Sequence, residues 1–188
     1  MSSVQWAYEI ALNLFADTLP RRWKHIQGVV AKVESIGGVY SNDEAQVLTA
    51  AALLHDIGYA PGVVVTGFHP LDGARYLEAQ GVDNRICGLV AHHSCAYREA
   101  GMRGLSLELS SWRDERTSIR DALWWADMTT TPDGAPKTFA KRVKEIQKRY
   151  GPHDIVSIFI EQAESELLSV VNRTEMKLKQ EKIFYKEK

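Results

Sequence analysis

Apolar residues recur every three or four positions along most of this 188-residue chain, which is the spacing of an amphipathic α-helix. Trp6, Ile10 and Leu14 show the spacing near the start, and Phe139 and its neighbours show it much later. The run of valines at 63–65 is too short to indicate a sheet. The pattern predicts an all-α fold, a helical bundle of about seven to eight helices. We expect these helices at residues 3–17, 20–36, 42–56, 69–80, 84–93, 117–128, 136–150 and 155–176.

The segment from Val47 to Leu54 differs from the others because apolar and small residues cover every side of it. A helix without a polar face belongs at the centre of a bundle, where neighbouring helices cover its whole surface. Asn42 suits the N-cap of this helix, and acidic residues follow it in the first turn. Gly58 is expected to end the helix.

Polar stretches that lack the helical spacing separate the predicted helices. They cover residues 61–68, 94–116 and 129–136. The stretch 94–116 is the longest, and long loops in compact domains are often functional. We therefore expect it to be irregular, to lie over a functional site and to bring Arg98 to a substrate.

The predicted helix 136–150 carries a strongly basic outer face. Its basic residues are Lys137, Lys141, Arg142, Lys144, Lys148 and Arg149. Nearby acidic residues balance this charge, so the pattern favours a solvated surface.

Composition limits the classes of protein that this chain can represent. A length of 188 residues favours a single domain, with a core at about 20–130 and C-terminal helices 136–176 packing on it. The 23 basic and 24 acidic residues nearly cancel, which gives no support to nucleic-acid binding. No apolar run has membrane-spanning length and no signal-peptide pattern is present, so we expect a cytoplasmic protein without a membrane partner. Cys87 and Cys95 are expected to stay reduced.

The pair His55-Asp56 is the main candidate for chemistry, because it follows directly on the apolar segment. Burying an imidazole and a carboxylate costs free energy unless both find a partner. A divalent metal would serve both, since neutral imidazole and carboxylate are common metal ligands. The alternative is a His-Asp pair that only caps a core helix.

Arginines accompany another candidate ligand near the start of the second predicted helix. Arg21 and Arg22 lie one turn before His25 and share its side of the helix. The planar guanidinium fork suits phosphate oxygens, so the three residues indicate a metal ligand flanked by phosphate-binding groups. A solvated role for each arginine remains open at this stage.

The later candidates are three histidines and an aspartate. His69 opens a predicted helix, and the helical spacing directs His93 toward the core while His92 lies at the edge of that face. Asp127 follows two tryptophans, and an unpaired carboxylate buried there would be costly. A metal partner would remove that cost.

Taken in chain order, these candidates are His25, His55-Asp56, His69, His92-His93 and Asp127. The order, on an all-α pattern, resembles the HD superfamily of metal-dependent phosphohydrolases, which is named for its His-Asp pair. Arg-Trp-Lys-His-Ile-Gln-Gly-Val at 22–29, Leu-Leu-His-Asp-Ile-Gly at 53–58 and Ala-Asp at 126–127 carry the resemblance, which covers roughly residues 20–130.

The resemblance implies a ligand set. His25, His55, Asp56 and Asp127 would hold one ion. His69-Pro70 and His92-His93 look like the additional ligands of members that hold two metals, occasionally three, bridged by the HD aspartate. Asp56 would then be the central catalytic residue, and His69 with one or both of His92 and His93 would hold the second ion. The metal could be Mn, Fe, Mg, Ni, Co or Zn.

The resemblance also implies a reaction, the hydrolysis of a phosphorylated small molecule such as a nucleotide, with Arg21, Arg22 and Arg98 neutralising phosphate charge. The opening and closing motifs look most like a small bacterial branch that splits dinucleoside tetraphosphates. Mixed-valent di-iron oxygenases share the fold and the ligand set and remain the main alternative. A non-catalytic nucleotide-binding module is a further alternative. The apolar residues of the last helix leave a homodimer possible.

Overall fold

The computed structural model describes residues 3–181, and within that range it contains ten α-helices and three short 3₁₀ turns without a β-strand. The prediction of an all-α fold is confirmed, although the number of helices is slightly higher than expected. The helices are α1 (Ser3–Phe15), α2 (Pro20–Ser35), α3 (Asn42–Leu54), α4 (His69–Ala79), α5 (Asn84–Ala91), α6 (Ala96–Arg103), α7 (Ser106–Leu109), α8 (Ser118–Met128), α9 (Phe139–Tyr150) and α10 (Ile155–Gln180). The turns are η1 (Gly37–Val39), η2 (Ile57–Tyr59) and η3 (His93–Cys95). None of the described helices is both long and apolar enough to cross a membrane.

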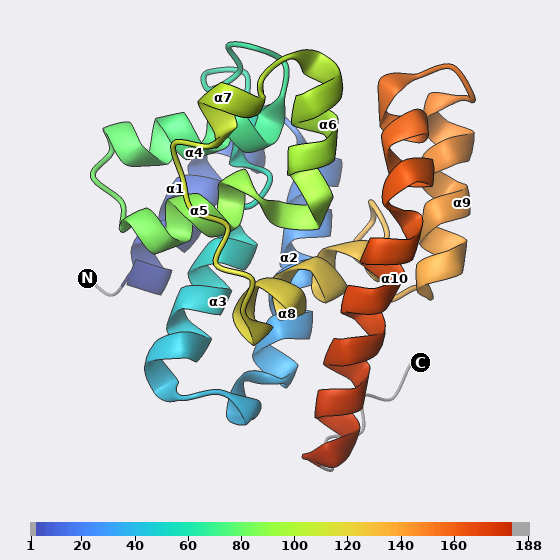
Figure 1. Ribbon diagram of the computed structural model, residues 1–188. Helices are drawn as coiled ribbons and strands as arrows, with labels where there is room; N and C mark the ends of the chain where they lie inside the picture. Colours follow the sequence, from blue (N-terminus) through green and yellow to red (C-terminus); the bar gives the residue numbers. More distant parts are fainter. Residues whose placement is uncertain (1–2, 182–188) are drawn as a thin grey trace.

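Helix α3 packs against α1, α2, α5 and α8, and its C-terminal half runs into the core of the bundle (Figure 1). Its residues from Ala50 to Leu54 are fully or almost fully buried, as an apolar helix requires. The N-cap is Ser41 rather than Asn42, because the Ser41 side chain and Glu44 bond to each other's main-chain N–H groups in a capping box.

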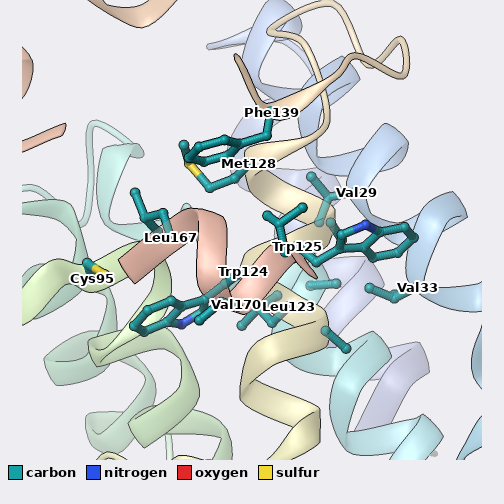
Figure 2. Packing of buried hydrophobic residues seen from close by; sticks show 14 of the residues in the cluster. Val29, Val33, Cys95, Leu123, Trp124, Trp125, Met128, Phe139, Leu167 and Val170 are labelled. Atoms are coloured by element: carbon teal, nitrogen blue, oxygen red, sulfur yellow. The ribbon is translucent and has the colours of Figure 1, made fainter. Parts of the chain in front are cut away.

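Helix α8 joins the centre of the bundle to the C-terminal helices. Trp124 and Trp125 point to different sides of α8, and Figure 2 shows Val170 near the first ring and Val33 near the second. Helix α10 packs chiefly against α8, and α9 lies beside α10 on one side of the molecule, opposite α4 and α5 (Figure 1). The large apolar side chains of α8 therefore tie the C-terminal pair to the rest of the core.

The expected irregular loop at 94–116 is wrong, because much of this stretch is helical as α6 and α7. Ser94 and Cys95 take positive φ angles of 48° and 62°, which turn the chain after η3 begins and let α6 start at Ala96. Gly104, at φ 71°, ends α6. Non-glycine residues rarely adopt such angles, so the composition gave no sign of this sharp reversal.

Helix α9 begins at Phe139 and not at Pro136 as expected. The preceding residues form a closed turn in which Lys137 N–H donates to the Thr129 carbonyl and Thr131 N–H donates to the Ala135 carbonyl. These bonds hold the chain in a loop until Thr138, which takes extended angles before the helix.

Gly58 does not end α3, which stops at Leu54, but lies inside the turn η2. Its role is to let the main chain of α4 approach closely. A Cβ placed on Gly58 would lie 2.0 Å from the carbonyl oxygen of His69 and 2.8 Å from the nitrogen of Gly73. The contact fixes the start of α4 against the segment that follows α3.

Substituting Gly58→Ala is expected to destabilise the protein, because main-chain atoms cannot move aside as a flexible side chain would. Overpacking of this kind costs about 1–3 kcal/mol, so the midpoint of thermal unfolding should fall by several degrees in a circular-dichroism melt. Gly62→Ala is the matched control, since nothing lies within 4 Å of a Cβ at that position. Equal midpoints for the two variants would contradict this role for Gly58.

Candidate metal centre

His55 and Asp56 occupy the point where α3 ends. His55 keeps helical angles as the C-cap of α3, whereas Asp56 (φ −97°, ψ 6°) begins the turn into η2. Both are buried, and the Nε2 atom of His55 lies 3.4 Å from Oδ2 of Asp56. The change of backbone angles after α3 thus lets two consecutive side chains face one space.

Helices α2 and α8 bring two further predicted ligands to this space. His25 Nε2 lies 3.1 Å from Asp127 Oδ1 and 3.8 Å from Asp56 Oδ2. His25, His55 and Asp56 each offer a ligand atom within 4.8 Å of the others. Asp127 lies beside this group, bound to His25.

A second group lies on the other side of Asp56. His69, from the first residue of α4, and His93, from η3, place their Nε2 atoms 3.0 Å apart. The His69 Nε2 atom is 3.5 Å from Oδ1 of Asp56, and the three residues meet the same 4.8 Å limit. Asp56 therefore presents one carboxylate oxygen to each group of histidines.

Main-chain carbonyls determine which nitrogen of three of these histidines is available. Nδ1 of His25, His55 and His93 lies 3.0, 2.8 and 2.6 Å from the carbonyl oxygens of Thr131, Ala52 and Val90. An Nδ1–H donated to a carbonyl leaves the Nε2 lone pair free to bind a metal. His55 Nε2 is buried and has no hydrogen-bond partner within the described structure. An unsatisfied lone pair of this kind is what a cation would occupy.

Electrostatics in the cluster also favour a cation. Burial acts to raise the pKa of Asp56, but the charges of Arg22 and His55 outweigh it and hold that pKa well below its usual range. Burial likewise opposes ionisation of Asp127, while hydrogen bonding from His25 and the charge of His55 lower its pKa. Burial acts to lower the pKa of His55, yet the Asp56 charge raises it to about 9, so without a metal a proton takes the position at Nε2 that a metal ion would otherwise occupy. The two buried carboxylates thus attract positive charge.

The donor set fits one or two divalent cations. It combines imidazole nitrogens with carboxylate oxygens, and His69 keeps a pKa well below its usual range because of burial and the neighbouring His93. The 3.0 Å between the nitrogens of His69 and His93 also suits two ligands of one ion, since metal–imidazole bonds are about 2.0–2.1 Å long.

The predicted Arg22 and three residues that the sequence analysis did not assign to the site, Tyr59, Ser94 and Arg142, complete the surroundings. Arg22 donates to Asp56 over 2.7 Å, and its guanidinium lies 4.0 Å from the centre of the Tyr59 ring. Tyr59 in turn stacks on His69 with ring centres 4.0 Å apart. Ser94, which has a positive φ of 48°, donates to Asp127 over 2.5 Å. Together with these residues, Arg142 lines a cavity of about 80 Å³ that also contains Asp56, His69 and His93.

The structure leaves three predicted site residues outside the cluster. His92 Nε2 faces the Trp112 carbonyl at 2.7 Å, so of the two adjacent histidines only His93 reaches the cluster. Arg98 pairs with Glu166, and Arg21 is exposed and pairs with Asp133.

The expectation of a solvated basic face on α9 is wrong for Arg142. This residue is only 4% exposed, and both Arg142 and Arg149 line the cavity next to the histidine cluster. A residue-by-residue reading of helix polarity cannot detect this, because a basic residue facing a polar cavity and one facing solvent leave the same pattern.

Comparison with known proteins gives one match. The family model described as HD domain matches residues 22–124, which is more than half of the chain. No curated protein and no solved structure matches this chain. The matched range contains Arg22, His25, the His55-Asp56 pair and His69, and it ends shortly before Asp127. The chain therefore belongs to the HD domain family, whose members are generally metal-dependent hydrolases.

Proposed function

We propose that this protein is a metal-dependent phosphohydrolase that acts on a nucleotide or on another phosphate ester or anhydride. One observation carries the proposal: the buried carboxylate of Asp56 lies between two groups of imidazoles and also accepts a hydrogen bond from Arg22. Metal ligands and an anion-binding group thus meet at one residue.

His25, His55, Asp56 and Asp127 are the residues that would hold one divalent ion, and Asp56, His69 and His93 would hold a second. When bound, such ions supply an activated water and neutralise charge on a phosphoryl group. Asp56 serves both groups, and we assign it the central catalytic role.

The remaining residues position these ligands and the substrate. Arg22 presents its planar fork beside Asp56, where it would bind phosphate oxygens. Tyr59 lies between Arg22 and His69 and holds both side chains by stacking. Ser94 fixes one oxygen of Asp127, which leaves the other toward His25. This arrangement prepares the site before substrate arrives.

A di-iron oxygenase remains the competing function, because two groups of ligands sharing one carboxylate suit two irons as well. The arginine beside the cluster favours the phosphohydrolase, since a phosphate substrate requires positive charge there. A nucleotide-binding module without catalysis is the third possibility.

Substituting Asp56→Asn is expected to reduce bound metal to less than one ion per chain and to lower phosphodiester hydrolysis at least about 100-fold, because the amide removes the charge that both groups share. Metal content by elemental analysis and release of nitrophenol from bis-(p-nitrophenyl) phosphate measure the two effects. Asp43→Asn is the control, since Asp43 is exposed at the opposite end of α3. Full activity in Asp56→Asn would refute the assignment.

The adjacent histidines provide a sharper comparison. His93→Ala should lower the metal content, because its Nε2 belongs to the second group. His92→Ala should keep the metal content and lose about 1 kcal/mol of stability, because the Trp112 carbonyl loses its partner. Elemental analysis and thermal melts of both variants show which of the two histidines binds metal. A loss of metal only in His92→Ala would reverse the assignment.

Hydrolysis is expected to proceed equally fast in air and under nitrogen, because transfer of a phosphoryl group to water consumes no oxygen. Parallel assays in a glove box and with an oxygen electrode, using protein loaded with manganese or iron, test this expectation. Oxygen uptake, an iron absorption band and no hydrolysis would identify an oxygenase instead. Nucleotide binding without any turnover would identify a binding module.

A further inference from the structure

A second cavity, of about 180 Å³, adjoins the metal centre. It is far larger than the roughly 10–15 Å³ that a single water molecule requires. Its lining consists of Leu19, Arg21, Arg22, His25, Pro132, Arg142 and Arg149. Arg22, Arg142 and Arg149 also line the cavity that contains Asp56, so the two spaces share one wall.

Basic side chains dominate this lining, and none of its residues is acidic. The arginines do have carboxylate partners, which stand outside the lining: Asp133 for Arg21, Asp56 for Arg22 and Glu145 for Arg142 and Arg149. The carboxylates hold the guanidinium groups in place without occupying the space they surround. A cavity of this kind attracts an anion.

Arg142 supplies an independent sign of a ligand. It is 4% exposed, yet its Nε atom is buried without a hydrogen-bond partner in the described structure. A buried donor of a charged group is normally satisfied, since leaving it unpaired is costly. Glu145 pairs with both Arg142 and Arg149, so the two side chains are already oriented side by side.

We propose that this cavity binds a phosphate group that is not attacked, joined through an anhydride bond to the phosphoryl group at the metal centre. The inference rests on the proposed function and narrows its substrate to phosphoric anhydrides, such as nucleoside diphosphates, triphosphates or longer phosphate chains. In the reaction, water oxygen bonds to the attacked phosphorus, the bridging P–O bond breaks, and the bridging oxygen leaves with the phosphate held by Arg142 and Arg149. The proton of the water passes to solvent.

The three arginines of the shared wall can serve two different phosphate groups. Arg22 reaches Asp56 directly and serves the reacting group, whereas Arg149 is distant in sequence and comes from α9. Two phosphate groups of a chain need adjacent positive sites, and a guanidinium fork suits each of them. A phosphomonoester would fill only the site at Arg22.

Arg149→Gln tests the proposal, because Arg149 is exposed enough for its substitution to leave the fold intact. Binding of tripolyphosphate and of orthophosphate to the purified full-length protein is measured by isothermal titration calorimetry. We expect tripolyphosphate affinity to fall about tenfold, as for the loss of one charge-assisted hydrogen bond, and orthophosphate affinity to fall less, because orthophosphate can also bind beside Arg22 without reaching Arg149. Lys148→Gln is the matched control, since it removes the same charge from an exposed neighbour that lines neither cavity.

Kinetics separate this proposal from the proposed function. Arg149→Gln should raise KM for a nucleoside triphosphate about tenfold and raise KM for p-nitrophenyl phosphate by a clearly smaller factor, whereas Lys148→Gln should change neither. If hydrolysis occurs but Arg149→Gln and Lys148→Gln weaken tripolyphosphate equally, the cavity is not a phosphate site and the function stands. If no substrate is hydrolysed but Arg149→Gln selectively weakens tripolyphosphate, the anion site stands and the function fails.

Discussion

The burial of Asp56 is the constraint on which the site depends. A carboxylate that is 3% exposed at the centre of a helical bundle loses most of its hydration, and this loss is costly unless positive charge replaces it. Arg22 provides one such charge at 2.7 Å, and the imidazoles on both sides provide donors for a cation. Asp127 is a second buried carboxylate nearby, and its hydrogen-bond partners are His25 and Ser94. Removing one of these partners would leave negative charge buried in the bundle without compensation.

Helix ends provide the means to orient the ligands. The last carbonyls of a helix lack partners within it, and His55 and His93 use the carbonyls of Ala52 and Val90, each three residues earlier. A histidine just beyond a helix therefore satisfies an orphan acceptor and turns its Nε2 atom outward. His69, at the start of α4, is held differently, by stacking against the Tyr59 ring. Local helix geometry thus decides how each ligand is fixed.

Much of the fold could be predicted because the hydrophobic spacing reports directly on burial. The helices before residue 93 and α8 lie close to their expected positions, and His25, His55, Asp56, His69 and His93 meet as their helices suggested. The sequence left the choice between His92 and His93 open: helical spacing favoured His93, and only the structure places its Nε2 atom beside His69. What the sequence could not reveal depends on tertiary contacts: the left-handed angles at Ser94 and Cys95, and the space beside Gly58. Neither feature leaves a recognisable pattern of hydrophobic and polar residues in the sequence.

Helix α9 shows that the pattern of polar residues can predict solvent exposure wrongly. The same helix carries the residues to which we assign the choice of substrate. Arg142 and Lys148 look alike in sequence, yet one is buried beside the metal centre and the other is exposed. The family match ends at residue 124, so the ligands up to His93 belong to the shared part of the domain and α9 lies beyond it. A phosphate chain would need charges beyond those that serve the reacting group, and α9 is the element that adds them. We therefore assign metal binding and the reaction to the ligands of the shared domain, and the choice of substrate to α9. The two parts meet at the wall formed by Arg22, Arg142 and Arg149.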